Sequence, residues 1–109
     1  MAYEEALAHH IRTRLSDHPG LTEREMFGGI AFMINGHMAV GVAGEELIVR
    51  VGREAHDEAI ARPGTRVFDM SSRPMRGWIL VSPVGYRDDV DLDDWLSRGA
   101  AFAESLAPK

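Results

Sequence analysis

The sequence predicts an α+β fold of two layers, with elements in the order α-β(3)-α-β(2)-α and an antiparallel sheet. Three observations predict this class. Near the N-terminus an apolar residue recurs at every fourth position, as on one face of a helix: Tyr3, Leu7, Ile11 and Leu15. An Asn35-Gly36 pair lies between two apolar runs, which is the strongest short-range signal of a β-hairpin. A second apolar stripe with helical spacing follows a group of aspartates near the C-terminus.

Each predicted element has its own boundary signal. The first helix, residues 3–18, ends at Pro19-Gly20. The strands within residues 24–51 turn at Asn35-Gly36, where a type I′ turn needs positive φ at both positions, and again at Gly44-Glu45. The remaining elements are a short helix at 53–61 that ends before Pro63-Gly64, strands at 66–70 and 77–82, and a last helix at 91–106 with Leu92, Trp95, Leu96, Phe102 and Leu106 near one face.

The Asn-Gly turn also predicts which side chains share a face of the sheet. A two-residue turn places Ile34 opposite His37 and Phe32 opposite Ala39, and side chains alternate between the two faces. The face expected to pack against the helices consists of Ala31, Met33, Met38, Val40, Val42, Leu47, Val49 and Val51. The other face consists of Ile30, Phe32, Ile34, His37, Ala39, Gly41, Ile48 and Arg50.

The second of these faces is the candidate interaction face. A sheet that is buried on one side only carries polar residues on its other side, yet most members of this set are apolar: Ile30, Phe32, Ile34, His37, Ala39, Ile48 and Arg50. A contiguous apolar patch of this kind needs a cover. Self-association through this face is the simplest one, and a helix or the end of the chain is the alternative.

Length and composition limit the class of protein. A chain of 109 residues with 45% hydrophobic content predicts one domain, residues 1–109, with its own core. The absence of cysteine excludes disulfide frameworks, thiol nucleophiles and cysteine-based metal sites. The N-terminus lacks the basic and apolar regions of a signal peptide, and no apolar run approaches the roughly 18 residues of a membrane helix. We therefore expect a cytoplasmic protein without membrane contact.

The charge of the chain is unevenly distributed. The net charge is −5, but residues 50–76 carry six arginines against four acids. These arginines are the candidate contacts for a nucleic acid: Arg50, Arg53, Arg62, Arg66, Arg73 and Arg76. Within this set Arg53, Arg66, Arg73 and Arg76 are the candidate contacts for an anion in general, although the loop around Arg73 and Arg76 is equally an ordinary strand connection. Acidic segments on both sides disfavour strong DNA binding.

No catalytic or metal-binding motif is present in the sequence. Gly28-Gly29 precedes a strand rather than a helix, so it predicts a bend or bulge and not a phosphate-binding loop. The five histidines lack the spacing of metal ligands. The aspartates of residues 88–94 lack the pattern of a calcium loop and are typical of the capped, acidic first turn of a helix. We therefore expect no catalytic residues, no metal and no cofactor.

Two long segments together resemble a known family. The segments are "EREMFGGIAFMINGHMAVGVAGEELIVRVG", and, after a short helix, "RPGTRVFDMSSRPMRGWILV", followed by a last helix with an acidic start. They resemble the N-terminal domain of the TfoX/Sxy regulators of bacterial competence, and the resemblance covers Leu21 to Leu106. It implies an α-β(3)-α-β(2)-α fold similar to secretion-chaperone-like domains. It also implies a role as a transcription co-regulator and supplies no catalytic residues. It predicts the N-terminal domain alone, without the C-terminal helical domain of the full regulators.

The expected function is therefore that of a non-enzymatic regulatory domain. We expect it to act through protein contacts, either with a second copy of itself or with the transcription machinery. The alternative is a protein that binds nucleic acid or a small anionic ligand through its arginines. Direct nucleic-acid binding is expected to be weak because of the overall acidity.

Overall fold

The computed structural model describes residues 3–26, 28–68 and 75–108. Its ten elements confirm the predicted α+β class and its antiparallel sheet. The helices are α1 (Glu5–Arg14), α2 (His56–Ile60), α3 (Pro83–Tyr86) and α4 (Asp89–Ser105). The strands are β1 (Leu21–Met26), β2 (Gly29–Ile34), β3 (His37–Ala43), β4 (Glu46–Arg50), β5 (Thr65–Val67) and β6 (Trp78–Val81). Two of these elements, β1 as a separate strand and α3, are additional to the predicted order.

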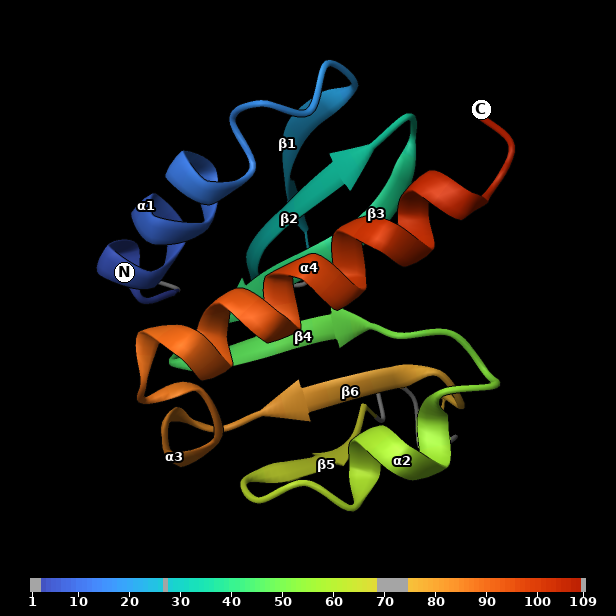
Figure 1. The fold of residues 1–109 in the computed structure, drawn as a ribbon. Helices are drawn as coiled ribbons and strands as arrows, with labels where there is room; N and C mark the ends of the chain where they lie inside the picture. Colours follow the sequence, from blue (N-terminus) through green and yellow to red (C-terminus); the bar gives the residue numbers. More distant parts are fainter. Residues whose placement is uncertain (1–2, 27, 69–74, 109) are drawn as a thin grey trace.

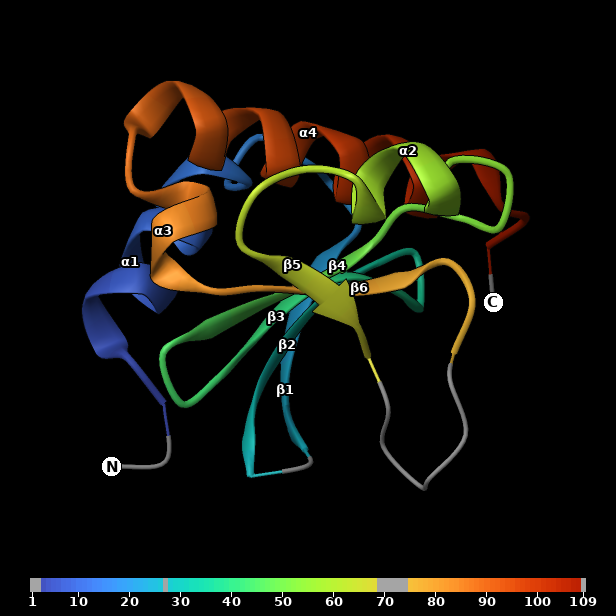
Figure 2. The ribbon, with the colours of Figure 1, turned by 90° about the horizontal axis from the view of Figure 1, so that it is seen from below.

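The six strands form one antiparallel sheet in the order β1-β2-β3-β4-β6-β5. Helix α4 crosses the middle of the sheet, α2 lies over β5 and β6, and α1 lies beside the β1–β2 end (Figure 1). Seen along the sheet, α4 and α2 lie on the same side, and the opposite side carries no described helix (Figure 2). The large core cluster lies between the sheet and the helices, and Trp95 and Leu96 of α4 are almost fully buried in it.

Both predicted hairpin turns are present. Asn35 and Gly36 have φ of 54° and 86°, which confirms a turn with positive φ at both positions. Ala43 pairs with Glu46 across the second turn, so the predicted pairs Val42–Leu47 and Val40–Val49 also form.

The predicted register of β2 against β3 is wrong beyond the first two residue pairs. Ile34 pairs with His37 and Met33 with Met38 as expected, but Phe32 then lies opposite Val40. Ala39 is the extra residue of a β-bulge, in which two residues of one strand oppose one residue of the other. Because side chains alternate with a period of two, a shift of one residue moves every later side chain to the opposite face.

The bulge corrects the candidate interaction face. Four of its apolar members are buried against the helices, with relative exposures between 0% and 4%: Ile30, Phe32, Ile34 and Ala39. The chain's own helices therefore cover these residues, which is the alternative considered above. In their place Ala31, Met33 and Met38 lie on the helix-free face, contrary to the prediction, whereas Val40, Val42, Leu47, Val49 and Val51 belong to the main core as expected.

The helix-free face forms a second, smaller core. Ile48 belongs to it as predicted, but it is fully buried. Its other buried members are Ala31, Met38, Phe68 and Leu80, with Met33, Ala43, Met75 and Trp78 packed around them. His37 lies at the margin of the sheet, where its Nε2 is 2.6 Å from the carbonyl oxygen of Ala107 beyond α4. The apolar side chains of this cluster are thus largely buried.

The aspartate-rich segment begins α4 as predicted. Asp88 is the N-cap residue, although its side chain makes no capping hydrogen bond, and Asp89 and Asp91 lie in the first turn. Asp93 and Asp94 have a different role, because Asp93 binds Arg14 of α1 and Asp94 binds Arg62 in the turn after α2. The first helix is shorter than predicted and gives way to turns after Arg14.

Candidate anion-binding site

The structure separates the candidate arginines into two groups. Arg62 binds Glu58 and Asp94, Arg66 binds Glu46, and Arg76 binds Asp57 at 3.0 Å. Arg53 is exposed and forms no ion pair with any of the described residues. Arg73 lies outside the described residues. Three of the six candidate arginines are therefore paired with the protein's own acids.

Arg50 has an unusual environment for an arginine. It is the last residue of β4 and pairs with Trp78 of β6. The central guanidinium carbon lies 4.9 Å from the ring centre of Trp78 and 5.2 Å from that of Phe102 on α4. No carboxylate in residues 3–26, 28–68 or 75–108 forms an ion pair with it. Burial lowers the pKa of the Arg50 guanidinium, although an arginine stays protonated at neutral pH. The result is a partly desolvated cation held by two aromatic rings.

A close approach of two glycines builds the floor beside Arg50. The carbonyl oxygen of Gly77 accepts hydrogen bonds from the backbone N–H groups of Val51 and Gly52. The backbone N–H of Gly77 donates a hydrogen bond to Nδ1 of the buried His56, at 2.9 Å. Gly77 has φ of 93°, and a Cβ there would lie 2.8 Å from the carbonyl carbon of Gly52. Only glycine at position 77 allows the backbone to pass this close to residue 52 without strain.

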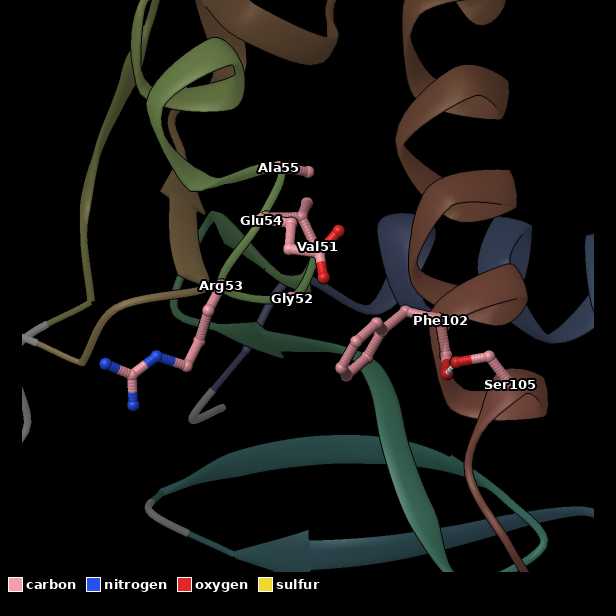
Figure 3. A pocket seen from close by; sticks show the side chains of 7 residues that line it. All are labelled: Val51, Gly52, Arg53, Glu54, Ala55, Phe102 and Ser105. Carbon is pink, nitrogen blue, oxygen red and sulfur yellow. Dashed lines mark hydrogen bonds between the residues drawn. The ribbon is translucent and has the colours of Figure 1, made fainter.

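Two hollows open on this floor. The smaller, of about 290 Å³, is lined by Arg50, Gly52, Arg53, Arg76, Gly77, Trp78 and Phe102. The larger, of about 570 Å³, is lined by Val51, Gly52, Arg53, Glu54, Ala55, Phe102 and Ser105. They share Gly52, Arg53 and Phe102, so they adjoin. In the larger hollow the Phe102 ring points toward Gly52, Glu54 points toward the space between the loop and α4, and Arg53 points to the opposite side (Figure 3).

The arrangement provides positive charge and an apolar wall side by side. Arg50 and Arg53 lack acidic partners among the described residues, and among the same residues Arg76 pairs only with Asp57, whose side chain is 80% exposed. An anion in the smaller hollow would meet guanidinium groups that need little rearrangement to bind it. Among the described residues no group of three or more His, Asp or Glu side chains could hold a metal ion.

Sequence reasoning identified the arginines but not the site that they form. Arg50 was expected on an interaction face and Arg53 among the anion contacts, and the structure brings these two together with Arg76. Arg66 lies elsewhere, on the edge strand β5. The aromatic residues Trp78 and Phe102 and the carboxylate of Glu54 were missed, because they come from three segments distant in the chain. Arg lies next to Gly at Gly52-Arg53 and Arg76-Gly77, but also at Arg98-Gly99 outside the recess, so no local signal marks the site.

Fold and site together define a small α+β domain with a cationic, aromatic-walled recess and no recognised catalytic motif. The chain matches the model of the TfoX N-terminal domain over residues 13–103. It therefore belongs to the TfoX N-terminal domain family, as the resemblance predicted, and this family is regulatory and non-catalytic. No curated protein and no solved structure matches the chain. None of the described helices has the length and apolar character needed to cross a membrane.

Proposed function

We propose that this chain is a non-enzymatic regulatory domain related to bacterial competence, that it works in the cytoplasm, and that it acts by contacting a partner of the transcription machinery. Membership of the TfoX N-terminal domain family supports the regulatory role. The observation that carries the proposal is the Arg50 recess, in which a guanidinium stacked on Trp78 and Phe102 has no acidic partner among the described residues. The domain recognises an anionic group through this recess.

The recess replaces the predicted apolar face as the candidate binding surface. Phe32 has no exposed surface, so it cannot contact a partner without unfolding of the sheet. The arginines of the recess, in contrast, line hollows that are open to solvent. Self-association through Phe32 is therefore no longer the favoured form of the interaction.

The regulatory role is tested in the native host by removing the gene and restoring it as wild type or as a variant. We expect transcript levels of DNA-uptake genes and the transformation frequency to change on removal and to return with the wild type. The Arg53→Ser variant should restore them poorly, because Arg53 lines the recess and its side chain forms no ion pair or hydrogen bond with the described residues. The Arg24→Ser variant is the matched control, since Arg24 is an exposed arginine of β1 that forms no ion pair with any described residue. Unchanged transcripts after removal would overturn the regulatory role.

A further inference from the structure

We infer that the recess beside Arg50 binds a nucleoside monophosphate, a small anion in which a phosphate is linked to a planar ring. This inference rests on the proposed function in one respect, namely that the recess recognises an anionic group. It extends the proposal by naming the class of ligand and by assigning a task to each wall of the two hollows.

Size favours a small molecule with two distinct parts. Small-molecule sites are concave hollows of about 300 to 1,000 Å³ with mostly apolar walls and a few polar groups. The larger hollow, of about 570 Å³, falls within this range, and the smaller one beside it has room for a compact charged group. Because the two adjoin at Gly52 and Phe102, one molecule can place its charge in one and its body in the other.

The smaller hollow fits the phosphate. Three guanidinium-bearing side chains line it, from the end of β4, the following loop and the turn before β6: Arg50, Arg53 and Arg76. A guanidinium presents its N–H donors in a fork that matches phosphate oxygens. The Arg50 guanidinium is already partly removed from water, and the attraction between a cation and an anion is stronger where water screens it less. Asp57 competes only for Arg76, from an exposed position.

The larger hollow fits a planar ring that carries a donor group. The Phe102 ring points into it and offers a face for stacking (Figure 3). Val51 and Ala55 add apolar surface, and the Glu54 carboxylate points into the same space from the side opposite Phe102. Arg53 points away from Glu54, so the positive and negative ends of the recess are separated. A base with an exocyclic amino group would donate to Glu54 while its phosphate stays with the arginines.

The surrounding charges favour a free nucleotide over a nucleic-acid strand. Beyond the recess α2 carries Asp57 and Glu58 on its exposed surface, and the loop carries Glu54. A strand that continued out of the recess would bring further phosphates toward these carboxylates. The net charge of −5 opposes a polyanion in the same way, whereas a single phosphate in the smaller hollow meets three arginines and no carboxylate among the lining residues.

The test is isothermal titration calorimetry on the 109-residue chain with four probes: 5′-AMP, adenosine, inorganic phosphate and 5′-IMP. We expect 5′-AMP to bind, and adenosine and phosphate to bind at least about tenfold more weakly, since each fills only one hollow. 5′-IMP has a carbonyl oxygen in place of the amino group, so it presents an acceptor to the Glu54 carboxylate at that position, and its affinity should be about tenfold lower.

Two variants locate the ligand within the recess. Arg53→Ser should weaken 5′-AMP at least about tenfold and leave adenosine unchanged, because only the phosphate contacts that side chain. Glu54→Gln should remove the preference for 5′-AMP over 5′-IMP. Arg24→Ser on β1 should behave like the wild type. Arg53, Glu54 and Arg24 are all exposed, and thermal unfolding followed by circular dichroism checks that each variant is folded.

Three results would overturn the inference. They are no heat of binding with 5′-AMP at millimolar concentration, equal affinity for 5′-AMP and adenosine, and tighter binding of a single-stranded oligonucleotide with a steep salt dependence. The proposed function fails separately, since it depends on host transcripts and not on nucleotide affinity. A domain that binds no 5′-AMP but still needs Arg53 in the host would retain the regulatory proposal and lose this one.

Discussion

The surroundings of Arg50 determine both its contribution to the stability of the fold and its capacity to bind an anion. Its guanidinium has exchanged water for the faces of Trp78 and Phe102, and each such contact contributes about 0.5 to 2 kcal/mol. This gain is opposed by the free energy that the charged guanidinium loses when it leaves water, and no carboxylate of the described residues offsets that loss. An apolar side chain of similar length would stack as well and would avoid that loss. Retention of a cation here is better explained by binding than by folding.

The corresponding prediction concerns Arg50→Met. The methionine fills the same space, so we expect the free energy of unfolding to change by less than about 1 kcal/mol, measured by urea denaturation. Binding of anions in the recess should fall sharply in the same variant. A loss of stability well above this value would show that Arg50 is primarily structural. Arg98, which binds Glu58 and Asp94 while it stacks on Trp95, provides the contrast, and Arg98→Met should destabilise more.

Gly77 sets a steric limit at the same site. Its φ of 93° disfavours any residue with a Cβ, and the added atom would lie 2.8 Å from the backbone of Gly52. We expect Gly77→Ala to lower the free energy of unfolding by more than about 2 kcal/mol. Gly28→Ala is a matched control, because Gly28 has φ of 76° but nothing within 4 Å of the added Cβ. Equal losses in the two variants would show that the close approach of residues 52 and 77 contributes nothing.

At the scale of the elements, the sequence predicts the strands better than their faces. The Asn35-Gly36 turn is readable because its residues have special backbone conformations. The bulge at Ala39 is not readable, because Ala39 and Val40 are both ordinary strand residues and either register gives an apolar face. Only the packing of α4 over the sheet selects between the two registers. The same limit applies to the recess, since its aromatic walls come from β6 and α4 while its arginines come from β4 and the loops.

The register makes a direct prediction for Phe32. With the bulge Phe32 is fully buried, so Phe32→Ala should lower the free energy of unfolding by about 3 to 5 kcal/mol, measured by urea denaturation. In the unbulged register Phe32 would lie on the helix-free face and pack against the smaller cluster, so the same change should cost less. Met26→Ala on β1 serves as the control, because Met26 is 39% exposed and its loss should change stability by about 0.5 kcal/mol or less. A loss below about 1 kcal/mol for Phe32→Ala would contradict the bulge.

Across the whole molecule, ion pairs hold the helical layer to its neighbours. Arg12 of α1 forms a two-bond contact with Glu23 of β1, and Arg14 of α1 binds Asp93 of α4. On the other side of the layer Arg98 of α4 binds Glu58 of α2. The net charge of each segment does not reveal these ion pairs, because they join residues that are far apart in the sequence. The acidic ends of the chain are therefore partly structural.

These ion pairs predict a loss of stability in acid. The hydrogen bond from Arg12 lowers the pKa of Glu23, and hydrogen bonds from Arg76 and Arg98 lower the pKa values of Asp57 and Glu58. A carboxylate with a lowered pKa stabilises the folded state above its unfolded pKa, near 4, and this contribution disappears as the pH falls through the lower, folded value. The free energy of unfolding should therefore be level near neutrality and decrease below about pH 4.

Glu23 is the pair member best suited to test this, because its side chain is less than one third exposed and both of its oxygens bind Arg12. Glu23→Gln should lower the free energy of unfolding at pH 7 by about 1 kcal/mol or less, after allowance for solvent screening, and should make the decrease in acid shallower. Urea denaturation between pH 7 and pH 2.5 measures both effects. Glu25→Gln is the control, since Glu25 is an exposed glutamate of the same strand that forms no ion pair with any described residue. An acid profile of Glu23→Gln parallel to that of the wild type would show that the Arg12–Glu23 pair does not contribute to the pH dependence of folding.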